Sequence, residues 1–282
     1  MSGHALHLER HGRGPALMLL HGFTGTGSSL AGLASAFGHE YETLAPDLPG
    51  HGRTAFPHGA ADYGFAACVG DLVATLESTG HRRAHWLGYS MGARLALACA
   101  LRSPASVASL VLVGARAGIQ DPAERAARRR ADEALADRIE ALGVEAFVDE
   151  WLAQPLFATQ RRLGAAFLEE QRRARLGQDA RGLAASLRAL GPGAQPPLFD
   201  ELSRVHVPVL LVTGALDERF VGHARDLARR LPQAEVCAIA DAGHAVHLEQ
   251  PGAFLRAVDD FLRRVADPAS SLHSNPVQEI AS

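Results

Sequence analysis

One pentapeptide constrains the fold of this chain more than any other feature: Gly88-Tyr89-Ser90-Met91-Gly92. It follows the apolar run 84–87 and precedes residues 93–98, which are rich in alanine and leucine. A G-x-S-x-G between such flanks predicts a strand, a sharp turn and a helix, with the serine hydroxyl at the tip of the turn. The glycines are expected because a side chain there would collide with the adjoining strand or helix. The motif alone is not specific, so residues elsewhere must decide its meaning.

The rest of the chain alternates short apolar runs with stretches of helical periodicity. Strands are predicted at 6–9, 16–20, 42–46, 84–87, 109–113, 208–213 and 236–240, and helices at 62–79, 93–98, 221–231 and 251–265. The first strand is expected to be antiparallel. The alternation itself predicts a mostly parallel central sheet with helices on both faces, so the fold class is α/β.

This alternation breaks between residues 117 and 200, where Ala, Arg, Glu and Leu dominate and β-branched runs disappear. Such a composition predicts several helices without a strand. We interpret 117–200 as a helical cap inserted into a core formed by 1–116 and 201–266. The tail 267–282 is polar and contains proline and several serines, which predicts disorder.

Two residues downstream complete a catalytic constellation with Ser90. Asp217 lies just past the predicted strand 208–213, and His244 lies just past 236–240. A serine hydroxyl reacts when an imidazole takes its proton, and the imidazole works best when a carboxylate fixes its tautomer. The chain order serine, acid, histidine, with each residue at the carboxyl end of a strand, suits an open α/β sheet.

Each partner of the serine has a neighbour that could replace it. Glu218 could be the acid, but it would sit one residue further round the turn than Asp217. His247 could be the base, but the glycine directly before His244 favours the tight turn that aims a ring inward. We therefore prefer Asp217 and His244, with Glu218 and His247 as alternatives.

The loop after strand 16–20 is rich in glycine and begins His21-Gly22-Phe23. Negative charge that develops on a substrate oxygen needs donors fixed in advance. The backbone N–H groups of Phe23 and Met91 are predicted to point into one oxyanion hole from two sides. The alternative is a turn that only reverses the chain.

Composition narrows the partners and the compartment. The net charge is −3, which gives no reason to expect nucleic acid or stable membrane association. All 28 basic residues are arginine, which excludes a Schiff-base lysine and favours forked recognition of anions. The cysteines, Cys68, Cys99 and Cys237, form no C-x-x-C, and no histidines stand at metal-ligand spacing. We predict a soluble cytoplasmic protein without metal or cofactor, either a monomer or a weak oligomer.

Together these residues resemble the α/β-hydrolase superfamily and, within it, the 2-succinyl-6-hydroxy-2,4-cyclohexadiene-1-carboxylate synthase (MenH) family of menaquinone biosynthesis. The resemblance covers roughly residues 15–265. The motifs that carry it are His21–Gly25, Asp47–Gly52, Gly88–Arg94, Trp151–Phe157, Leu183–Leu187, Gly193–Pro196 and Gly243–Glu249.

The resemblance implies a lyase that eliminates pyruvate from a small polycarboxylate substrate. Ser90 would be the immediate base, relayed by His244 and oriented by Asp217, while the N–H groups of Phe23 and Met91 hold the oxyanion. Substrate carboxylates would be bound by the residues that match the family's contacts, which are Tyr89, Arg94, Arg128, Trp151 and Arg175.

Several of these positions admit another interpretation. Glu124 and Arg128 could form a solvated ion pair on one helix face, and Trp151 could be part of the cap core. Arg172 and Arg173 compete with Arg175 for its role. For the whole chain, the alternatives are a carboxylester or carbon–carbon bond hydrolase with Ser90 as nucleophile, and a catalytically silent binding module.

Overall fold

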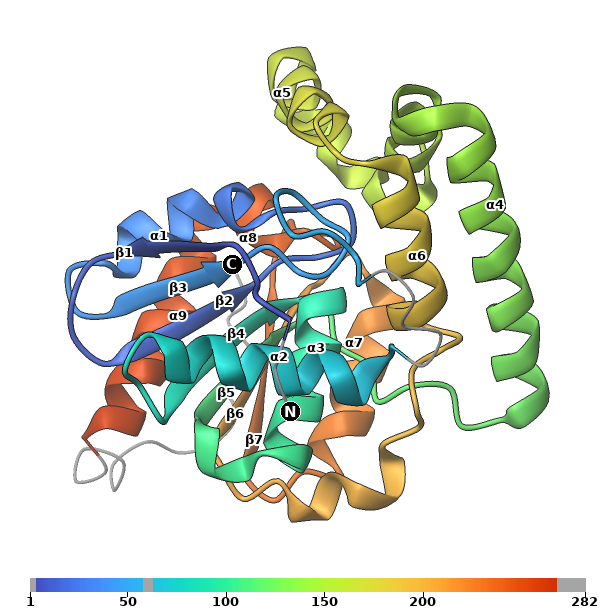
Figure 1. Cartoon of the computed structure of the whole chain (residues 1–282). Coiled ribbons are helices and arrows are strands. Elements are labelled where there is room, and N and C mark those ends of the chain that lie inside the picture. The colour runs from blue at the N-terminus through green and yellow to red at the C-terminus, as the bar shows by residue number, and fades with distance from the viewer. Residues whose placement is uncertain (1–3, 58–62, 268–282) are drawn as a thin grey trace.

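The computed structural model describes residues 4–57 and 63–267, and it is organised around one seven-stranded sheet (Figure 1). The strands are β1 (Leu8–His11), β2 (Ala16–Leu20), β3 (Glu42–Pro46), β4 (Ala84–Tyr89), β5 (Val107–Val113), β6 (Val209–Gly214) and β7 (Ala234–Ile239). Their order across the sheet is β1-β3-β2-β4-β5-β6-β7. Only β1 is antiparallel to its neighbour, so the mostly parallel sheet is confirmed.

Helices cover both faces of this sheet, which confirms the predicted α/β class. The helices α2 (Phe65–Ser78), α3 (Met91–Arg102) and α7 (Glu218–Ala228) pack on one face, and α1 (Ala31–Phe37) and α9 (Pro251–Ala266) on the other. β2, β4, β5 and β6 are almost wholly buried between these layers. Apolar runs therefore occupy the centre of the sheet, as two-sided burial requires.

Between β5 and β6 the described chain is entirely helical or irregular. It contains α4 (Pro122–Leu152), η3 (Pro155–Leu163), α5 (Ala165–Leu176), α6 (Ala180–Leu190) and the short helix η4 (Phe199–Arg204). In Figure 1 the green to yellow helices α4, α5 and α6 stand together outside the layers that cover the sheet. They share a small core of their own, built from Ala136, Ile139, Phe147, Val148, Leu183, Ala184 and Leu187. We call residues 117–200 the helical segment.

Several predicted boundaries differ from the observed ones. The first strand is Leu8–His11 rather than 6–9, and α7 begins at Glu218 rather than 221 because Asp217 caps it. The helix α1 was not predicted, since its seven residues are mostly small. The predicted disorder of the tail falls on 268–282, which lie outside the described residues. Among the helices of 4–57 and 63–267, none has both the length and the apolar character needed to cross a bilayer.

Candidate active site

The pentapeptide forms a strained turn between β4 and α3. Ser90 has φ 52° and ψ −104°, a conformation that costs about 1–3 kcal/mol for a residue with a side chain. Its N–H donates to the Val113 carbonyl at 2.8 Å, which ties the turn to β5. A Cβ at Gly88 would overlap the Gly92 backbone, and one at Gly92 would overlap the Leu20 carbonyl. Both glycines are therefore required by the close approach of β2, β4 and α3.

Ser90, His244 and Asp217 lie in hydrogen-bonding order. His244 Nδ1 lies 2.9 Å from Asp217 Oδ2, and His244 Nε2 lies 3.2 Å from Ser90 Oγ. Because an ionised carboxylate only accepts, Nδ1 carries the proton and Nε2 is free to accept the serine O–H. The other Asp217 oxygen accepts the Phe220 N–H at 3.4 Å. The ring packs so closely on Gly114 that a Cβ there would lie 2.8 Å from it.

The two alternatives to this trio point elsewhere. Glu218 is exposed and begins α7. His247 is buried, with its ring 4.6 Å from that of Tyr89, and its Nδ1 has no hydrogen-bond partner among the described residues. Burial, and then the nearby His244 and Arg175, lower the pKa of His247 to about 3. The structure thus brings Asp217 and His244 to Ser90, and keeps His247 as a neutral ring behind Tyr89.

The predicted donors Phe23 and Met91 lie on two segments that are bonded together. The Gly92 N–H, next to Met91, donates to the His21 carbonyl at 3.1 Å. Within residues 4–57 and 63–267 neither the Phe23 N–H nor the Met91 N–H finds an acceptor. Two free N–H groups on bonded segments beside a serine can receive a developing oxyanion.

Gly22, next to Phe23, makes room for the aromatic ring of Tyr89. A Cβ at Gly22 would lie 2.8 Å from the Tyr89 ring. The same ring lies 5.4 Å from that of His244. Burial raises the pKa of the Tyr89 hydroxyl, so it stays protonated and can donate a hydrogen bond at neutral pH.

Two buried histidines hold the loop that carries Phe23. His21 Nε2 accepts the Leu48 N–H at 3.0 Å, and His51 Nε2 accepts the Thr24 N–H at 3.2 Å. Burial lowers the pKa of His21 to about 4 and that of His51 to about 3. Both rings are therefore neutral and keep an acceptor nitrogen for the backbone.

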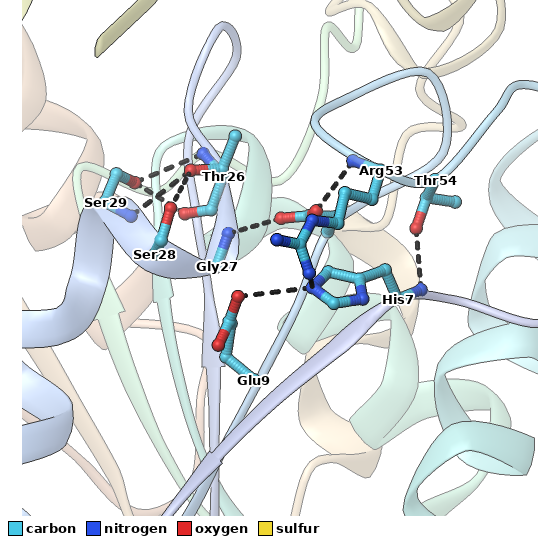
Figure 2. Close-up of polar contacts among 9 residues, drawn as sticks. His7, Glu9, Thr26, Gly27, Ser28, Ser29, Arg53 and Thr54 are labelled. Carbon is cyan, nitrogen blue, oxygen red and sulfur yellow. Dashed lines mark hydrogen bonds and ion pairs between the residues drawn. The ribbon is translucent and has the colours of Figure 1, made fainter. Parts of the chain in front are cut away.

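The buried carboxylate of Asp47 joins the same loop to a second backbone segment. It accepts the Gly27 N–H at 2.7 Å and the Arg53 N–H at 2.8 Å. Figure 2 shows dashed lines from the N–H groups of Gly27 and Arg53, and one between the Thr54 hydroxyl and the N–H of His7. The glycine-rich loop is thus fixed to the loop after β3.

Arg94 is a buried cation one turn into α3. The residue is only 6% exposed, and its Nη1 donates to Gln195 Oε1 at 3.4 Å. The guanidinium lies over the Phe65 ring at 5.5 Å. Among the described residues no carboxylate lies within ion-pair distance of it. Burial lowers its pKa to about 9, which leaves it charged at neutral pH.

The carboxylate that acts on Arg94 electrostatically, Asp132, is already used by other groups. Asp132 accepts Arg128 Nε at 2.6 Å and the Gly193 N–H at 2.8 Å. Arg128 therefore pairs with Asp132 rather than with Glu124, and its side chain remains 38% exposed. The alternative pair of Glu124 with Arg128 does not form among the described residues, because Arg128 pairs with Asp132, four residues later on the same helix.

Arg116 is a further cation that sequence reasoning missed. It follows the end of β5, and its guanidinium donates to the Gly118 carbonyl at 3.2 Å. Burial and the neighbouring Arg219 and Arg128 lower its pKa. Its place just past the carboxyl end of a central strand is the signal that identifies it.

Trp151 packs directly on Phe23. The two ring centroids are 5.3 Å apart, and Phe157 and Phe147 lie 5.7 and 5.8 Å from the indole. Its Nε1 is buried without a hydrogen-bond partner in the described chain. Trp151 therefore packs against the core of the helical segment, and its indole also contacts the loop of Phe23 and carries an N–H that is free to donate.

Of three neighbouring arginines, only Arg175 reaches the loop of Phe23. Its Nε donates to Thr24 Oγ1 at 3.1 Å, and its Nη1 to the Gln171 carbonyl at 2.6 Å. Arg172 is paired with Asp149 and Glu145, and Arg173 lies on the surface near Glu169.

Within the described ranges no cluster of His, Cys, Asp and Glu forms a metal site.

Comparison with known proteins agrees with this geometry. The family described as alpha/beta hydrolase fold matches residues 15–251, and the chain belongs to that family. Within it, the chain is 36% identical to a putative 2-succinyl-6-hydroxy-2,4-cyclohexadiene-1-carboxylate synthase of Bacillus subtilis, over 89% of this chain and 91% of that protein. The enzyme of that name from Salmonella agona is 32% identical, with coverage of 92% and 98%. The solved structure of MenH from S. aureus superposes with a TM-score of 0.87 at 29% identity, covering 93% and 99%.

Proposed function

We propose that this chain eliminates pyruvate from 2-succinyl-5-enolpyruvyl-6-hydroxy-3-cyclohexene-1-carboxylate to give 2-succinyl-6-hydroxy-2,4-cyclohexadiene-1-carboxylate, a step in menaquinone biosynthesis. The observation that carries the proposal is Arg94. It is a buried cation close after the serine turn, and no carboxylate of the described residues lies within ion-pair distance of it. The similarity to synthases of this name over nearly the full length supports it.

An unpaired buried guanidinium is costly, because the charge loses its hydration and gains no opposite charge. Arg128 and Arg116 lie near enough to interact electrostatically with Arg94, and within residues 4–57 and 63–267 Asp132 is the carboxylate that acts on it. The excess positive charge favours a ligand with several carboxylates over a neutral ester. In this proposal Arg94, Arg128 and Arg175 bind those carboxylates, with Tyr89 and Trp151 as further contacts.

The trio then acts as a base rather than as a nucleophile. Ser90 Oγ removes a ring proton, and its own proton passes to His244 Nε2 at 3.2 Å, while Asp217 stabilises the imidazolium. The electron pair of the broken C–H bond forms the new double bond, and the C–O bond to the enolpyruvyl group breaks. The leaving group departs as the enolate of pyruvate and becomes pyruvate by taking up the proton held on His244, which restores Ser90 and His244; no acyl-enzyme forms and no water attacks. The N–H groups of Phe23 and Met91 stabilise the enolate-like oxygen.

The division of the chain is part of this proposal. Residues 1–116 and 201–266 would form the catalytic core, and the helical segment 117–200 would be a cap over the site. Its support is that Trp151 and Arg175, both from this segment, contact the loop of Phe23.

The decisive experiment measures pyruvate release from the enolpyruvyl substrate, generated in place by the preceding enzyme, with a short-chain aryl ester in a parallel reaction. Rapid pyruvate release with slow ester cleavage is the expected result. Efficient ester cleavage without pyruvate would overturn the lyase and return Ser90 to the role of nucleophile in a hydrolase.

A further inference from the structure

Thr24, directly after Phe23, has an unfavourable backbone conformation. Its φ is 68°, in the left-handed region that a β-branched residue rarely adopts, and it is 1% exposed. Such a conformation costs about 1–3 kcal/mol and persists only where the surroundings hold it. The direction of the neighbouring Phe23 peptide depends on this residue.

All three polar groups of Thr24 are held. Its N–H donates to His51 Nε2 at 3.2 Å, its hydroxyl accepts Arg175 Nε at 3.1 Å, and its carbonyl accepts Gln178 Nε2 at 3.1 Å. Only the first contact comes from the sheet side of the molecule. The other two come from the junction of α5 and α6 in the helical segment.

Gln178 reaches further than this one residue. Its Nε2 also donates to the Gly25 carbonyl at 3.0 Å, and its Oε1 accepts the Gly52 N–H at 2.9 Å. The residue is 7% exposed. It therefore joins the loop after β2 to the loop after β3, and Asp47 joins the same two loops through other backbone groups.

The contacts of Gln178 require an amide. Two carbonyls face its nitrogen and one N–H faces its oxygen, so a carboxylate would place oxygen against oxygen at two points. A buried carbonyl left without a donor costs about 1–3 kcal/mol. The strained Thr24 would then lose one of the contacts that hold it.

We propose that Gln178 is a positioning residue for the oxyanion hole: it holds Thr24 in its left-handed conformation and thereby fixes the Phe23 N–H. This inference rests on the proposed use of Phe23 N–H as a donor. Gln178 touches no atom of the reacting centre in this account, so its main effect is on turnover; substrate affinity changes less, through the contact of Thr24 with Arg175.

The test compares Gln178→Glu and Gln178→Ala with Arg188→Gln. Arg188 lies on α6 and makes ion pairs only within the helical segment, with Glu133, Asp137 and Glu140. Loss of an oxyanion donor lowers kcat by about 10²–10³, so a displaced donor should lower kcat for pyruvate release at least tenfold. KM should change by a smaller factor than kcat, and Arg188→Gln should behave as wild type. A rise in KM alone, or an equal loss in Arg188→Gln, would overturn the proposal.

A second readout needs no turnover. Amide hydrogen exchange is followed in the peptide that covers residues 22–27, where Thr24, Gly25, Thr26 and Gly27 have bonded N–H groups. Faster exchange there in Gln178→Glu, with unchanged exchange in β5, is expected. Unchanged exchange in 22–27 would sink the positional claim even if pyruvate is released. If the wild type releases no pyruvate but exchange in 22–27 rises in Gln178→Glu, the proposed function fails, while the role of Gln178 in positioning Thr24 stands.

Discussion

Arg162 Nη2 lies 3.1 Å from Glu249 Oε2, so the helical segment donates to a buried carboxylate outside it, five residues after His244. The same carboxylate accepts the Gly243 N–H at 2.9 Å and the Ala245 N–H at 3.3 Å, the two amides that flank His244. The helical segment is therefore bonded to the histidine loop as well as to the loop of Phe23.

Glu249→Ala should disturb this loop far more than Arg162→Gln. It leaves two buried N–H groups without an acceptor, at about 1–3 kcal/mol each, whereas the Arg162 side chain is 40% exposed and its ion pair contributes about 1 kcal/mol or less. We expect a lower urea midpoint and a lower kcat for Glu249→Ala. Equal effects of the two substitutions would contradict this arrangement.

Ser90→Ala should lower kcat for pyruvate release by a factor of about 10²–10⁴, the usual contribution of a positioned general base. Substrate binding should remain, because the carboxylate contacts are elsewhere. Isothermal titration with the variant measures the Kd. Turnover like that of wild type would remove Ser90 from the mechanism.

Arg94→Met should make the free protein more stable and the enzyme worse. The substitution removes a buried charge without an ionic partner, so the free energy of unfolding should rise by about 1 kcal/mol or more, while kcat/KM for the polycarboxylate falls about tenfold to a hundredfold. Cleavage of any neutral ester should change little.

The matched control for Arg94→Met is Arg102→Met on the same helix. Arg102 Nη2 donates to Glu201 at 2.7 Å, and this substitution should be neutral or mildly destabilising. A loss of stability in Arg94→Met as well would show that Arg94 serves the fold rather than a ligand.

Stability should fall as the pH falls from about 6.5 towards 4. Burial lowers the pKa of His21 to about 4, and of His51 and His247 to about 3, from an ordinary 6.5. In that window the unfolded chain binds protons that the folded chain does not. Each such histidine lowers the free energy of unfolding by up to about 1.4 kcal/mol per pH unit.

Urea unfolding of wild type and His247→Phe at pH 7, 6 and 5 measures this dependence. The variant should show a shallower slope with pH, by up to one proton, whatever its stability at pH 7. An unchanged slope would mean that His247 is already protonated in the folded protein.

Gly143→Ala should destabilise the protein by about 1–3 kcal/mol, because Gly143 interrupts α4 with φ 78° and ψ 175°. The space around it is open, so the backbone alone decides. Gly70→Ala is the matched opposite: Gly70 is exposed within α2, and alanine there should stabilise by about 0.5–1 kcal/mol. Urea midpoints of the two variants test both signs.

The sheet was predictable because its signals are local. The central strands are short apolar runs that need burial on both faces, and the glycines around Ser90 report a steric requirement. The chain order of Ser90, Asp217 and His244 then predicted which loops meet. Their distances of 2.9 and 3.2 Å match that expectation, although their roles stay predictions.

The contacts of the helical segment were less predictable, since they depend on tertiary neighbours. Arg128 pairs with Asp132 and not with Glu124, a choice between two equal spacings on one helix. Gln178 joins two loops that are more than a hundred residues away in the sequence. A polar side chain carries no mark in the sequence of which distant backbone it will meet.

The separation between sheet and helical segment also bears on how this protein can evolve. The residues proposed for the reaction lie at the ends of the strands, whereas most of the proposed carboxylate contacts lie in residues 117–200. A descendant gene can therefore acquire a new substrate through changes in that insert while it retains the old reaction. Gln178 and Arg162 restrict this freedom, because any replacement insert must again offer an amide to Thr24 and a cation to Glu249.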